Sequence, residues 1–202
     1  MKPYLFKLSR LVVAMAVSFA FAGCTITHTI KSTDLPQLQA VSLLKSVRPK
    51  IFAFKEFKDI RGTDALWVAR AGVHEFMLDQ PVAFVVAMAI RKELERNGHT
   101  CFDYTQQIKA DFIVEGTVYK YRLMTYVGSF TGRPIGDIAV KLIISNTSTD
   151  KGILTRTYQE EGVIKSVGTG EQLTARDILS QTQLSMVKKM STDSELIDFL
   201  EK

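Results

Sequence analysis

The stretch Asp111–Arg122, DFIVEGTVYKYR, decides the expected fold, because two kinds of side chain alternate along it. The apolar Phe112 and Val114 fall on one side of an extended chain, and the polar Glu115 and Thr117 fall on the other side. A period of two residues is typical of a β-strand with one buried face. The stretch therefore predicts a half-buried strand in the middle of the chain.

Further strands are expected on both sides of this one. Residues 138–145 and 153–164 repeat the alternation after short turns, so we expect them to follow as consecutive antiparallel neighbours. Earlier in the chain, Lys50–Phe57 is β-branched and aromatic on both parities, which indicates a strand buried on both faces. Cys101–Tyr104 is predicted to form a further short strand.

Two main helices are expected around these strands. Pro81–Arg96 has apolar residues at helical spacing, with a proline at its start and Asn97-Gly98 after its end. Residues 174–190 show a second apolar stripe, and a short final helix is expected to follow from Thr192. The sequence predicts an α+β fold, a mainly antiparallel sheet of about 4–5 strands with two main helices packed on one face.

The amino terminus has the features of an export signal. Met1–Arg10 carries three basic residues and no acidic residue, and Leu11–Ala22 is almost wholly apolar. The apolar run is shorter than the roughly 20 residues that span a bilayer. Phe21-Ala22-Gly23-Cys24 resembles a bacterial lipobox, although Phe21 stands where leucine is usual. The resemblance implies that Cys24 becomes a lipidated first residue after cleavage, and plain secretory cleavage nearby is the alternative.

This interpretation divides the chain into three parts: a signal peptide at 1–23, a lipidated amino terminus and tether at 24–46, and a single periplasmic domain at 47–202. Two or more acyl chains on Cys24 would hold the domain stably on a membrane. Lipoproteins of this type that have Asp after the cysteine are commonly retained in the inner membrane. Thr25 therefore predicts an outer-membrane lipoprotein that faces the periplasm.

Charge and cysteine content exclude some classes of protein. Loss of residues 1–23 removes Lys2, Lys7 and Arg10, which takes the basic count from 26 to 23 against 21 acidic residues. A chain so nearly neutral lacks the basic surface on which nucleic-acid binding depends, so no nucleic-acid partner is expected. With Cys24 lipidated, Cys101 is left alone, and we expect it to pack in the core without a disulfide.

No catalytic motif stands out along the chain. The spacings of a nucleophile elbow, a P-loop, a zinc-protease helix and paired C-x-x-C are all missing from the sequence. His99 and Cys101 lie two residues apart, but two ligands do not make a zinc site, so a structural role is expected for both. We expect no enzyme activity, no metal and no cofactor other than the covalent lipid on Cys24.

Aromatic residues are the candidates for partner contacts. Some lie in the connection 59–79, which is long for a plain turn, and others follow the strand from Asp111. Tyrosine and tryptophan are enriched at binding hot spots, although packing within the sheet is the alternative for the second group. The candidate contact residues are Trp67, Phe76, Tyr119, Tyr121, Tyr126 and Phe130.

The pattern from Val47 onward resembles the YajG-like family of bacterial lipoproteins, and more loosely auxiliary envelope lipoproteins of the PqiC and LptE kind. The resemblance lies in Ile51–Phe57 with Asp59-Ile60-Arg61-Gly62, in Gln80–Gly98, and in the strand that opens at Ala110-Asp111. It covers about 80 residues and implies a compact α+β domain at the outer membrane without known catalytic residues.

Three functions are weighed on these grounds. The first is a non-catalytic accessory component that docks to a protein complex of the cell envelope. The second is a periplasmic binding module for a small ligand, a lipid or a peptidoglycan fragment. The third is an enzyme, which would need polar residues that converge in a pocket. Nothing in the sequence indicates an oligomeric state.

Overall fold

Two β-sheets and three α-helices make up the part of the chain that the computed structural model describes, which is residues 26–32, 42–62, 67–71, 74–106, 108–127, 132–148, 152–163 and 175–202. The larger sheet has six strands, and the smaller has three. Within these residues, none of the helices has both the length and the apolar character that a membrane span requires.

The larger sheet is mixed. One half is an antiparallel meander of three long strands, β7 (Phe112–Val127), β8 (Gly132–Asn146) and β9 (Ile153–Val163). In the other half, β2 (Ile51–Phe54) runs parallel to both of its neighbours, β7 and β6 (Thr100–Asp103). The two-residue strand β3 (Lys58–Asp59) also runs parallel to β7. The α+β class is confirmed, but the prediction of a mainly antiparallel sheet of 4–5 strands was wrong.

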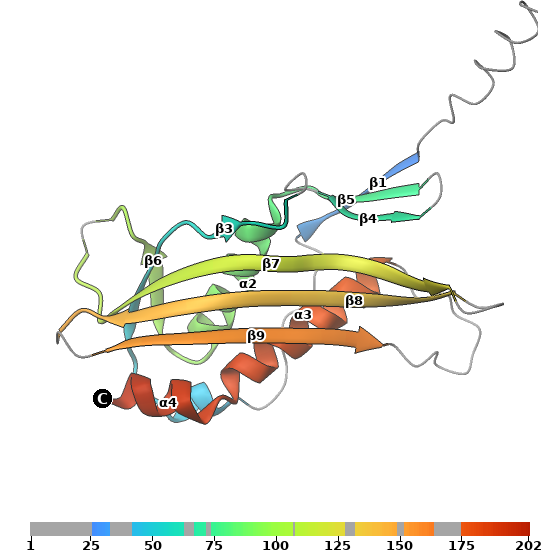
Figure 1. Cartoon of the computed structure of the whole chain (residues 1–202). Coiled ribbons are helices and arrows are strands. Elements are labelled where there is room, and N and C mark those ends of the chain that lie inside the picture. The colour runs from blue at the N-terminus through green and yellow to red at the C-terminus, as the bar shows by residue number, and fades with distance from the viewer. Residues whose placement is uncertain are drawn as a thin grey trace, which may run out of the picture.

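The helices lie behind the larger sheet in Figure 1, with α2 (Val82–Arg96) behind β7 and α3 (Ala175–Ser191) behind β8 and β9. The third, α4 (Ser194–Glu201), starts at Asp193, whose carboxylate accepts bonds from the amides of Glu195 and Leu196. The described residues therefore hold three α-helices, the two main ones that were expected and the short final helix that the sequence placed after them. A short 3₁₀ helix, η2 (Leu43–Ser46), buries Leu44 in the hydrophobic core that the helices form with the larger sheet.

The smaller sheet was not expected. Its strands are β1 (Ile26–Ile30), β5 (His74–Leu78) and β4 (Trp67–Ala71), with β5 in the middle. The sequence predicted a tether for the first and an extended connection for the other two. β1 has four exposed residues before the buried Ile30, so it lacks the apolar alternation that marks a strand. It is a strand because β5 supplies parallel hydrogen-bonding partners along its whole length.

A pair of glycines lets α3 approach the larger sheet closely. Gly136 of β8 and Gly162 of β9 are register partners, and both face Thr182 of α3. A Cβ atom on either glycine would overlap the Thr182 side chain. Gly162 lies within β9, in the strand that the sequence predicted over 153–164, and only hydrogen fits below the helix at this point.

The sequence Asp59-Ile60-Arg61-Gly62 fixes the chain against β7. The Arg61 guanidinium contacts the Asp59 carboxylate through Nε at 2.9 Å and Nη2 at 2.7 Å, and its Nη1 donates to the Tyr121 carbonyl at 3.0 Å. Both charged side chains are largely buried. The chain then turns at Gly62, whose φ of 73° favours glycine. The motif therefore holds the segment after β2 against β7.

Gly162→Ala should destabilise the fold by about 1–3 kcal/mol, because the added methyl group overpacks the contact with Thr182. Urea unfolding would measure the change in the free energy of unfolding. Thr182→Ala in the same chain should recover part of the loss, since it removes Oγ1, the atom nearest to the new methyl group. The control is Thr157→Ala, an exposed position of the same strand, and an equal loss there would contradict the role of the glycine pair.

Candidate functional site

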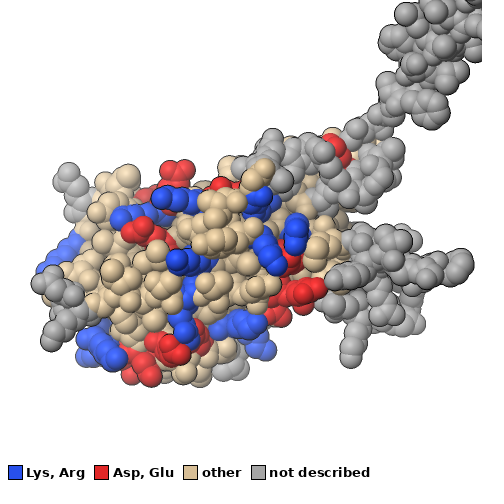
Figure 2. All heavy atoms as spheres, viewed as in Figure 1, with Lys and Arg blue, Asp and Glu red and all other residues tan. Residues whose placement is uncertain are grey.

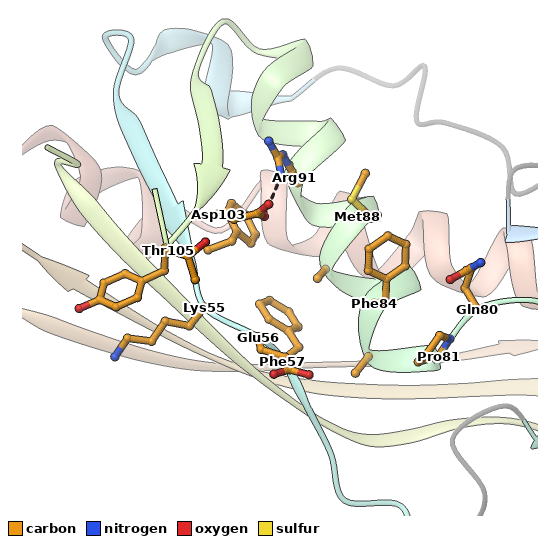
Figure 3. Close-up of a pocket in the computed structure, with 14 residues that line it drawn as sticks. Lys55, Glu56, Phe57, Gln80, Pro81, Phe84, Met88, Arg91, Asp103 and Thr105 are labelled. Atoms are coloured by element: carbon orange, nitrogen blue, oxygen red, sulfur yellow. Dashed lines mark hydrogen bonds and ion pairs between the residues drawn. The ribbon is translucent and has the colours of Figure 1, made fainter. Parts of the chain in front are cut away.

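A groove of about 580 Å³ opens at one end of α2 (Figure 3). Three segments line it: residues 54–57 after β2, residues 80–91 around the first half of α2, and residues 103–105 at the end of β6. The volume falls within the roughly 300–1,000 Å³ of pockets that bind small ligands. This groove is the candidate functional site.

The sheet topology places the groove. β2 and β6 are parallel neighbours, so their carboxyl ends meet at the same edge of the larger sheet, and α2 lies on the connection between them. Parallel strands need such a crossover connection. In open α/β sheets, ligands bind in the crevice outside the carboxyl ends of the strands. The groove lies at the corresponding place here, although only part of this sheet is parallel.

The floor of the groove is aromatic. Phe54 and Phe57 are buried and stack on one another, with ring centroids 6.1 Å apart and planes 18° apart. Above them, Phe84 is 52% exposed and Tyr104 is 50% exposed. Figure 3 shows the Phe84 ring projecting from the first half of α2. Large aromatic side chains left open beside a cavity commonly mark a binding surface.

Three of the four charged side chains that line the groove are paired within the chain, whereas Glu56 is exposed and makes no ion pair with the described residues. Lys55 Nζ lies 2.6 Å from Glu115 Oε1, and this hydrogen bond raises the pKa of Lys55 above its usual value. Arg91 contacts Asp103 at 3.2 Å and Glu95 at 3.0 Å, and it also donates to the Cys101 carbonyl at 2.7 Å. An anionic ligand would have to compete with these carboxylates. The groove is therefore better suited to apolar groups than to a charged head group.

His99 and Cys101 lie in the core and not at the groove. Burial raises the pKa of Cys101 to about 12, which is the opposite of what a reactive cysteine needs. Burial also lowers the pKa of His99, and its Nδ1 accepts a bond from the Lys50 amide at 3.2 Å. Both side chains are buried, and the sequence predicted this for Cys101. Among the described residues, no group of three or more His, Cys, Asp or Glu side chains could hold a metal ion.

The six candidate contact residues are dispersed. Tyr121 is a core residue, fully buried, and its hydroxyl donates to Gln183 Oε1 at 2.9 Å, so it does not present a contact surface. Tyr119 is 43% exposed beside a register shift in β7. Phe76 is half-buried and stacks on His28 with ring centroids 5.0 Å apart.

For two of the other predicted site residues the structure describes only the backbone, and two lie outside the described residues. Trp67 is the first residue of β4, and Tyr126 lies near the end of β7, opposite Arg133. Phe130 and the predicted lipidation site, Cys24, lie outside the described residues. Of the candidates whose side chains the structure describes, Phe76, Tyr119 and Tyr121 do not line the groove.

Sequence reasoning missed the groove residues Phe84 and Tyr104. Phe84 is an aromatic residue off the apolar stripe of α2, and that offset is a signal available in the sequence. Tyr104 ends the predicted short strand, and nothing in its neighbourhood indicates that it turns towards α2. The groove forms only when three distant segments come together, so no local pattern describes it.

Comparison with solved structures places the chain in a known class of fold, an α+β domain with a mixed sheet. Protein XCC0632 from Xanthomonas campestris, which carries the family label DUF330, covers 82% of this chain and 92% of its own length at 11% identity, with a TM-score of 0.53. Hypothetical protein CT253 from Chlamydia trachomatis covers 76% of this chain and 98% of its own at 7% identity and a TM-score of 0.50. Identities this low show the fold alone.

A third solved structure is a minor lipoprotein from Acinetobacter baumannii. It covers 70% of this chain and 92% of its own length at 12% identity, with a TM-score of 0.36. A score of that size does not establish a common fold. No protein-family model matches this chain, and no curated protein does.

Cys101 should resist thiol reagents in the native protein, because its buried thiol stays protonated at pH 8 with a pKa of about 12. Labelling with iodoacetamide, located by peptide mapping, should give no modification at Cys101 until urea unfolds the chain. Modification of the native protein as fast as of the unfolded protein would show that the thiol is open to solvent.

Proposed function

We propose that this chain is a lipid-anchored component of the bacterial cell envelope that binds another envelope protein without catalysing a reaction. The anchor is the predicted lipid on Cys24, and Thr25 favours the outer membrane with the domain facing the periplasm. The observation that carries the binding role is the open groove between α2 and the ends of β2 and β6.

The composition of the groove favours a protein segment as the occupant. Phe54 and Phe57 form an apolar floor. Phe84 and Tyr104 supply rigid aromatic surface, and these side chains lose little conformational entropy when a partner immobilises them. Apolar and aromatic anchors in such pockets provide most of the binding energy at protein interfaces. Because Lys55 and Arg91 are held by acidic partners and Glu56 is exposed at the rim, an acidic segment is disfavoured as the occupant.

A small apolar ligand is the second candidate. The volume of about 580 Å³ and the aromatic floor suit a flexible hydrocarbon chain as well as a peptide side chain. Native mass spectrometry of the protein purified from the periplasmic side separates the two proposals. A co-purifying small molecule would favour the ligand, and a protein adduct at the groove would favour docking.

The anchor is tested by metabolic labelling with palmitate. The chain without substitutions should incorporate the label, and its mature form should begin at Cys24. Cys24→Ser should abolish both incorporation and cleavage, since the thiol is the acceptor. Cys101→Ser is the matched control and should keep both. A labelled Cys24→Ser variant, or a mature chain that begins elsewhere, would overturn the anchor.

The docking surface is tested by photo-crosslinking in cells. A crosslinking amino acid at position 84 should capture one discrete protein, because Phe84 lines the groove and is half exposed. Position 153 is the control, since Ile153 is apolar and 71% exposed but lies outside the groove.

Ala87→Glu supplies the decisive comparison for this experiment. Ala87 lines the groove and also packs partly against the core, so circular dichroism must first show that the variant is folded, and the glutamate should then remove the adduct at position 84. An adduct that survives Ala87→Glu, or the same adduct from position 153, would contradict docking in the groove.

A further inference from the structure

The distance between the anchor and the folded domain is unusually short. This inference rests on the proposed lipidation of Cys24. β1 begins at Ile26, only two residues later, and two residues of chain span at most about 7 Å. β1 is paired with β5 along five register positions, from Ile26 with His74 to Ile30 with Leu78. The strand is therefore fixed to the domain, and no tether separates the domain from the lipid.

One end of the molecule is defined by this constraint. Ile26 and Ala71 are the register partners of His74, so β1 starts where β4 and β5 connect. Figure 1 shows the β7–β8 hairpin ending on the same side of the molecule, whereas α4 and the β8–β9 connection lie on the opposite side. β4 also contacts β7, which places the small sheet beside the meander. We call the side with Ile26 and His74 the anchor end.

We infer that the anchor end rests directly on the lipid surface, so that the bilayer is a second binding surface of the folded domain and fixes its orientation. Ile26 is apolar and 47% exposed at this end. Tyr126 lies one register pair from the end of the β7–β8 hairpin, where Val127 pairs with Gly132. Aliphatic and aromatic residues at such positions suit the interface between head groups and acyl chains.

The same constraint sets the height of the groove above the membrane. β5 advances about 13 Å from His74 to Leu78 at roughly 3.3 Å per residue, and Pro81 follows within about 10 Å more. The near edge of the groove therefore lies within about 25 Å of the anchor end. A partner that occupies the groove would itself sit at or beside the same membrane.

Depth-dependent quenching of a fluorophore tests the orientation. The lipidated protein would carry one fluorophore through T27C or I153C and would be placed in phosphatidylethanolamine–phosphatidylglycerol vesicles that contain nitroxide lipids. Thr27 is exposed in β1 beside the anchor end, and Ile153 is exposed at the far end of β9. Buried Cys101 should not compete for the label. We expect strong quenching at position 27 and none above background at position 153.

A spacer variant makes the test decisive. Insertion of about ten Gly and Ser residues between Thr25 and Ile26 adds a flexible reach of roughly 17 Å. It should relieve the quenching at position 27 while palmitate remains attached. Equal quenching at the two positions, or quenching that the spacer leaves unchanged, would overturn the inference and leave the anchor standing. A protein without palmitate would overturn the anchor and the inference together.

Discussion

The parallel pairing of β2 with β6 is the constraint on which the functional end of this protein depends. Parallel neighbours cannot be joined by a tight turn, so the chain must leave the sheet between them, and α2 is part of that excursion. The excursion places the beginning of α2 beside the ends of both strands, where the stacked Phe54 and Phe57 line the groove together with Phe84. A fully antiparallel sheet of the same strands would not form this groove.

The groove and the anchor end are surfaces of different chemistry. The groove has an aromatic floor, and its two cations, Lys55 and Arg91, are held by carboxylates, so it suits the apolar groups of the proposed protein partner. The anchor end presents the start of β1, separated by only two residues from the proposed lipid. Since β5 leads from the anchor end to Gln80 and Pro81 at the groove, one strand sets the spacing between the two surfaces.

Sequence patterns described the regular elements well and the assembly poorly. The helix from Pro81 and the three long strands have enough residues for a period of 3.6 or 2 to emerge, and all are present. β2 and β6 have four residues each, too few to reveal their direction, and polar β1 has no apolar period. Tyr121 was chosen as a candidate contact residue but lies in the core. Alternation along a strand shows that the strand has two faces, but it does not show which face another layer covers. Lipidation of Cys24 stays a prediction.

The pairing of β2 with β7 also governs when the fold can close. Ile51 bonds to Asp111, sixty positions further along the chain, so the middle of the larger sheet cannot assemble until that later segment is available. Contacts of such sequence separation fold slowly compared with local ones. Compaction of this sheet is therefore delayed until the chain has been made beyond Asp111.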